Sequence, residues 1–185
     1  MFPSFSAPSA GMNQEIQNLI NNLGPWWGTL EDFVFLGGFA IVVGALMSMY
    51  KSGKQGSPVT KLAIFSFIVG VLMTSLPAWM DSLSQTAFQT NAPSALTLTP
   101  SSNGSGAYAT IITFGFDVLM LVGLYATVKA LLLFRDSAED RSKTGPAIGH
   151  LVGGVVMLNA KTMLTSLALT IGGLFQTAVL KIIGG

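Results

Sequence analysis

The chain has 185 residues, of which 50% are hydrophobic and 9% charged, and its mean hydropathy is +0.61. A soluble domain carries roughly 25% charged residues, so this composition excludes a water-soluble globule and predicts an integral membrane protein. The sequence contains no cysteine, which excludes a disulfide framework, thiol catalysis and sulfur-ligated metals. The net charge is +1 and the basic residues are scattered at the edges of apolar runs, so direct binding of nucleic acid is not expected.

The N-terminal segment contains one short amphipathic pattern. Between residues 13 and 23, Ile16, Ile20 and Leu23 share one helical face, with Asn and Gln side chains opposite. Gly24-Pro25 follows directly and is typical of a helix end. The pattern predicts a short helix that ends at Gly24 and lies on the membrane surface or packs against protein neighbours.

A first transmembrane hairpin is predicted next. Residues 33–50 contain no charge and form about 27 Å of helix at 1.5 Å per residue, enough to cross a hydrocarbon core. A Gly/Ser/Pro turn with Lys51, Lys54 and Lys61 follows, and a second apolar run then extends from 62 to 79. The hairpin therefore has a basic tip.

A second hairpin follows a Ser/Thr/Gly/Pro-rich loop. Its first apolar run covers residues 108–134, and its charged tip contains Arg135, Arg141 and Lys143. Its last helix is predicted from residue 147 to beyond Gly172. Paired glycines permit a break without requiring one, so the last dozen residues either extend this helix or form a separate one.

The predicted fold is an all-α integral membrane protein, with four transmembrane helices as two hairpins and a short N-terminal amphipathic helix. Because Lys and Arg gather at both hairpin tips, the positive-inside rule places the tips in the cytoplasm, which makes the topology N-out and C-out. The expected segments are an N-terminal interfacial segment, a first hairpin, a periplasmic loop and a second hairpin, at residues 1–32, 33–80, 81–107 and 108–185.

Small residues mark two predicted packing ridges. In lipid, small side chains let helix backbones approach closely. Whether these ridges meet within one subunit or between subunits stays open. They comprise Ala40, Gly44 and Ser48 on the first spanning helix, and Gly149, Gly153 and Gly154 on the last.

Four polar side chains lie within or at the edge of the predicted spans. Asp117 and Lys161 are expected at similar depth, with Asn159 nearby, and a charge in lipid rarely occurs without a partner. We therefore expect an intramembrane ion pair that acts as a static clamp, with proton or ion relay as the alternative. His150 has no companion ligand or nucleophile at a suitable spacing, so it is expected to be a polar group near the cytoplasmic interface.

No catalytic or metal-binding motif is recognised in the sequence, so the protein is expected to be neither an enzyme nor a metalloprotein. The two halves also look like a loose duplication. Tyr50-Lys51 parallels Phe134-Arg135, and Gly70 and Met73 parallel Gly154 and Met157.

The order of several motifs resembles the small multi-spanning proteins of type IVB secretion systems, which are the DotE/IcmC-type components and the TraQ-type proteins of IncI-like conjugation systems. These motifs are Pro25-Trp-Trp, Tyr50-Lys51, Ser57-Pro58, Leu76-Pro77 and a core with His150, Leu151, Gly153, Gly154 and Asn159. The resemblance implies a structural subunit of the bacterial inner membrane that works with other secretion-system subunits and helps move DNA or protein between cells.

We therefore expect a homo-oligomeric, non-catalytic subunit that needs no cofactor. It either forms a pilus or channel or stays fixed in the inner membrane. Pilins of such systems are two-helix hairpins with basic loops, and this chain resembles two of them joined in series. For the pilus version, this resemblance implies an extracellular filament with phospholipid headgroups against the basic tips. The alternatives are a small transporter or ion channel that uses the mid-membrane polar residues, and a holin-like lysis protein.

Overall fold

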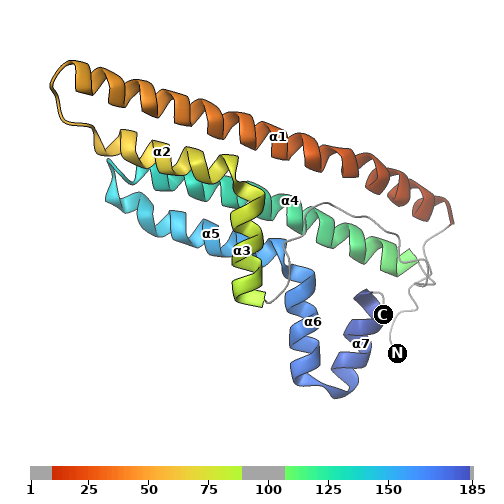
Figure 1. Ribbon diagram of the computed structural model, residues 1–185. Coiled ribbons are helices and arrows are strands. Elements are labelled where there is room, and N and C mark those ends of the chain that lie inside the picture. The colour runs from red at the N-terminus through yellow and green to blue at the C-terminus, as the bar shows by residue number, and fades with distance from the viewer. Residues whose placement is uncertain (1–9, 89–106, 184–185) are drawn as a thin grey trace.

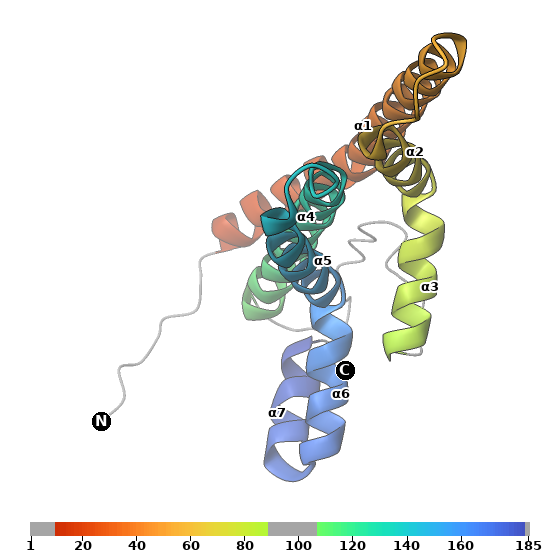
Figure 2. The same ribbon diagram turned by 90° about the vertical axis from the view of Figure 1, so that its left-hand side faces the viewer.

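The computed structural model describes residues 10–88 and 107–183, and every regular element in these ranges is a helix. Four helices form two hairpins that pack together, α1 with α2 and α4 with α5, and α4 contacts both helices of the first hairpin (Figures 1 and 2). The hairpin helices are α1 (Ala10–Lys54), α2 (Lys61–Thr74), α4 (Ala107–Asp136) and α5 (Thr144–Leu158); α3 (Leu76–Phe88), α6 (Ala160–Ile171) and α7 (Gly173–Ile183) project from them. A short 3-10 turn, η1 (Arg141–Lys143), precedes α5.

The first helix is longer than the sequence predicts. α1 has 45 residues and continues through Gly24 and Pro25, so the prediction of a separate helix that ends at Gly24 was wrong. Proline removes one backbone hydrogen bond, but the residues after it are held by packing. Trp27 is 3% exposed in the hydrophobic core, and its Nε1 donates to Glu31 Oε1 at 2.8 Å. Tertiary packing of this kind outweighs local helix propensity.

The second predicted span is broken. α2 ends at Thr74, and α3 leaves it at an angle of 80°. Pro77 has no N–H to continue the α2 ladder, but it is tolerated in the first turn of α3. Trp79 Nε1 donates to Leu72 O at 2.6 Å and so satisfies a carbonyl near the end of α2. Ser75 Oγ donates to Val71 O at 2.8 Å, in addition to the backbone bond from Ser75 N to the same oxygen.

The fourth predicted span is broken in the same place of its hairpin. α5 begins at Thr144 and ends at Leu158, and α6 turns away by 72° at Asn159. Asn159 Nδ2 donates to Val155 O at 2.9 Å, as Ser75 does to Val71. The two break residues even share backbone angles, with φ −106° and ψ 22° at Ser75 and φ −104° and ψ 18° at Asn159.

The chain turns again at paired glycines. Gly172 and Gly173 have φ of +69° and +62°, in the region that glycine adopts readily. α6 therefore ends at Ile171, and the last described residues form the separate helix α7. The third predicted apolar run, residues 108–134, is helical as part of α4, and Phe114–Asp136 within α4 is a candidate span. Residues 81–88 were predicted as loop but are helical, because α3 continues to Phe88. The rest of that loop lies outside the described residues.

Within the described ranges, two helical stretches are long and apolar enough to cross a membrane, Trp26–Lys54 and Phe114–Asp136. The number rises to four if each bent pair, α2 with α3 and α5 with α6, counts as one span. The hydrophobic core that joins the halves includes Trp27, Val69, Met73, Leu124 and Leu131.

Candidate functional site

Each half of the molecule is held together by one close crossing of glycines. A Cβ added to Gly38 would lie 2.9 Å from Gly70 O, and one added to Gly123 would lie 2.9 Å from Gly154 O. The backbones of α1 and α2, and those of α4 and α5, therefore touch without intervening side chains. Such contact supplies the dispersion energy that holds helices together in lipid. The same device occurs once in each half, which supports the duplication suggested by the sequence.

Only one of the predicted packing residues takes part in these crossings. Gly154 is buried against Thr127 and Gly123, whereas a Cβ at Gly44, Gly149 or Gly153 would meet nothing within 4 Å in the described part of the chain. Ala40 is exposed and Ser48 partly exposed. These ridges do not meet within the part of the subunit that the structure describes, and their use between subunits stays a prediction.

One hydrogen bond links the break of the second half to the first half. Asn159 Nδ2 donates to Ser84 Oγ of α3 at 3.1 Å, and the two residues are 3% and 2% exposed. The sequence drew attention to Asn159 but not to Ser84, because a single serine in a Ser-rich stretch carries no signal of its own. This bond ties α3 to the point where α5 becomes α6.

Asp117 is buried, with 8% of its surface exposed, and its Oδ2 has no hydrogen-bond partner among the described residues. Lys161 is exposed on α6, within Coulombic range of this carboxylate, yet the two form no ion pair in the described part of the chain. The two residues therefore lie on α4 and α6 without a direct ion pair among the described residues, and the clamp stays a prediction. His150 lies partly exposed on α5.

The basic residues of the two predicted tips differ in position and in the groups that they contact. Lys51 and Lys54 lie in the last turn of α1, where the helix dipole stabilises positive charge. Lys61 is the first residue of α2. Arg135 instead reaches the first half, where its Nε donates to Ser66 Oγ at 3.0 Å. Arg141 lies in the turn η1.

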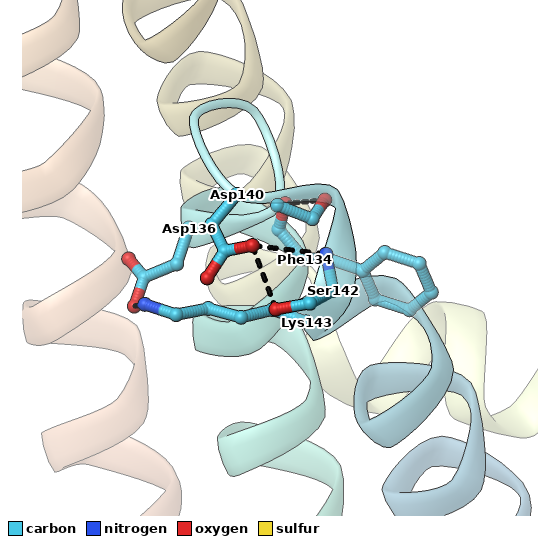
Figure 3. Close-up of polar contacts among 6 residues, drawn as sticks. Phe134, Asp136, Asp140, Ser142 and Lys143 are labelled. Atoms are coloured by element: carbon cyan, nitrogen blue, oxygen red, sulfur yellow. Dashed lines mark hydrogen bonds and ion pairs between the residues drawn. The ribbon is translucent and has the colours of Figure 1, made fainter.

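The second tip is organised by acids as well as bases (Figure 3). Lys143 Nζ lies 3.1 Å from Asp136 Oδ2, and Ser137 Oγ donates to Phe134 O at 2.6 Å. Asp140 Oδ1 accepts from both Ser142 Oγ and Ser142 N, at 2.6 and 3.0 Å. The carboxylates therefore order this loop, and they reduce the basic character that the sequence suggested for it.

The Asp140 cap predicts a pH dependence of the tip. Hydrogen bonds from the hydroxyl and backbone N–H of Ser142 hold the pKa of Asp140 below its usual range. Because the pKa of Asp140 is lower in the folded protein than in the unfolded chain, its carboxylate stabilises the turn fully at pH values above the unfolded-state pKa. This stabilisation is lost as the pH falls through the folded-state pKa. Ser142→Ala should raise the pKa of Asp140 towards its ordinary value, as measured by NMR titration of its carboxyl carbon, with Ser137→Ala as the control that leaves it unchanged.

The described residues contain no group of three or more His, Cys, Asp or Glu side chains that could hold a metal ion. The fold is thus that of an all-helical protein with two to four candidate membrane-spanning helices and a repeated hairpin plan. Comparison of the chain with protein-family models, curated proteins and solved structures found no match. The resemblance to type IVB secretion subunits therefore rests on its sequence motifs alone.

Proposed function

We propose that the protein is a non-catalytic structural subunit of a conjugative or type IVB-like secretion apparatus, which assembles with copies of itself in the bacterial inner membrane and supports transfer of DNA or protein between cells. In this proposal both hairpin tips face the cytoplasm, both bent pairs count as spans, and the chain is N-out and C-out.

The exposure of α1 carries the proposal. Only 11% of the first span's apolar window is buried inside the chain, against 33% for the second span. Phe33, Phe39 and Met47 are 66%, 56% and 60% exposed. Lipid could cover such a surface, but the outward-facing small residues Ala40 and Gly44 also favour close packing against another helix. A subunit of an assembly accounts for both features.

The proposal predicts particles larger than one chain. The protein extracted into lipid nanodiscs should give a mass distribution by mass photometry that is centred on a multiple of the chain, and deletion of the chain from cells that carry the system should abolish transfer. A single-chain particle together with unimpaired transfer would contradict it.

Location separates the two versions of this function. Immunolabelled electron microscopy of sheared extracellular material, with antibody to residues 99–106, would show labelled filaments for a pilus subunit. Label confined to the membrane fraction would identify a fixed inner-membrane component. In the filament version, phospholipid headgroups would face the tips through Lys51, Lys54 and Lys61.

A further inference from the structure

One face of α4 is built as a seam with alternating spacings of three and four residues. Side chains at these spacings lie on one side of a helix and form the contact strip between paired helices. Leu124 and Leu131 in this seam are each 3% exposed, and Arg135 at its end donates to Ser66 of α2. The α4 seam comprises Asp117, Leu121, Leu124, Val128, Leu131 and Arg135. The first half of the molecule covers it.

α1 carries the same seam at the same spacing, with identical Asp, first Leu, Val and last Leu. The α1 seam comprises Asp32, Leu36, Phe39, Val43, Leu46 and Tyr50. The alignment that pairs these residues also places Gly38 on Gly123, the two glycines at equivalent helix crossings. The correspondence is therefore one of structure as well as sequence.

The two seams differ in what covers them. Phe39, Leu46 and Tyr50 are 56%, 50% and 72% exposed, whereas their α4 counterparts Leu124 and Leu131 are buried. α1 meets α2 with another side, through Gly38 and Val42. The α1 seam thus lacks, within the described chain, the cover that the α4 seam receives.

The chain also offers a second copy of the covering face. Ser66 and Val69 of α2, which lie at the boundary with the second half, are 7% and 2% exposed. Aligning Gly70 with Gly154 places these two residues on His150 and Gly153 of α5. His150 is partly exposed, and a Cβ at Gly153 would meet nothing within 4 Å in the described part of the chain. Within residues 10–88 and 107–183, no seam like that of α4 lies against this α5 face.

We propose that the α1 seam of one copy docks on the α5 face of a second copy, repeating between chains the interface that joins the two halves within a chain. This inference rests on the proposed self-assembling function and names the surfaces used. Tyr50 of one copy takes the position of Arg135, and His150 of the next copy takes that of Ser66, so a phenol and an imidazole that can share a hydrogen bond are brought together.

The assembly that follows is directional. Because the α1 seam and the α5 face are different surfaces, the contact is head-to-tail. In a row of subunits, the α1 seam is unused at one end and the α5 face is unused at the other. Heterologous contacts of this type close into a ring or continue as a filament, according to the rotation between neighbours.

The natural chain has no cysteine, so introduced thiols report contacts without background. A copy with Tyr50→Cys and one epitope tag is expressed together with a copy that carries His150→Cys and a different tag. Mild oxidation of isolated membranes should shift both tags to one band of twice the chain mass, and neither variant alone should form this band. Tyr125→Cys, a tyrosine 66% exposed on α4, paired with His150→Cys, is the matched control that should stay uncrosslinked.

The outcomes separate this inference from the function on which it rests. A dimer from Tyr50→Cys alone, without the mixed dimer, would show a symmetric contact and overturn the head-to-tail seam. Nanodisc particles of several chains without any mixed crosslink would overturn the seam but leave a self-assembling subunit. Single-chain particles would overturn both.

Discussion

Gly154→Ala should destabilise the protein by about 1–3 kcal/mol, the usual cost of forcing extra atoms into a packed interface. The added Cβ would lie 2.9 Å from Gly123 O and 3.0 Å from Thr127 N, and would also press on the Thr127 hydroxyl. Two of these neighbours are backbone atoms, which cannot rotate away. α4 and α5 would have to separate, and the whole second half depends on their contact.

Gly149→Ala is the matched control, on the same helix with nothing within 4 Å of the new Cβ in the described chain. Because alanine favours a helix over glycine, this variant should be neutral or more stable by up to about 1 kcal/mol. Unfolding in detergent, followed by tryptophan fluorescence, measures both. Equal shifts in the same direction would show that the crossing is not the tight contact described.

Asn159→Ala should lower the free energy of unfolding by about 1–2 kcal/mol, because its side chain donates to both Ser84 Oγ and Val155 O in a buried site. Ser84→Ala removes only the bond between the halves and should cost less. The coupling energy between the two substitutions should be about 0.6 kcal/mol, the average for hydrogen bonds between membrane helices. Strictly additive effects in a double-mutant cycle would contradict a direct bond.

The sequence predicted the helices best where a long apolar run had clear charged ends. Residues 108–134 correspond closely to α4, whereas the first predicted turn overlaps the end of α1, which continues to Lys54. The error at Gly24-Pro25 arose because the sequence shows a local helix stop but does not show that Trp27 is buried in the hydrophobic core. Local propensity is a weak guide wherever such an anchor follows.

The two helix breaks were not equally visible. Pro77 lies two residues after the first break, inside the apolar run predicted from 62 to 79, and is a sequence signal for it. The second has no proline: both the backbone N–H and the side-chain Nδ2 of Asn159 donate to Val155 O at the break. An asparagine inside an apolar run is as readily interpreted as an intramembrane polar group. The sequence alone does not distinguish these two roles.

The glycines at the helix crossings show a different limit of prediction from sequence. The chain has 21 glycines, and those at crossings look like those on free faces. Gly154 was predicted, but Gly38, Gly70 and Gly123 were not, because only the position of the opposing helix shows which glycine is at a crossing. The register of the two halves, once known, identifies all four together.

The uninterrupted length of α1 determines how far its N-terminal end lies from its apolar stretch. At 1.5 Å per residue its 45 residues extend about 68 Å, whereas a hydrocarbon core is about 30 Å thick. The Gly38–Gly70 crossing holds its C-terminal part, and Trp26–Lys54 is the stretch of α1 that is apolar enough to cross a membrane, so residues 10–25 form a further rod of about 24 Å outside that stretch. Whatever meets the free end of α1 does so at a height set by covalent geometry, and a small tilt of the anchored part displaces that end by a larger distance.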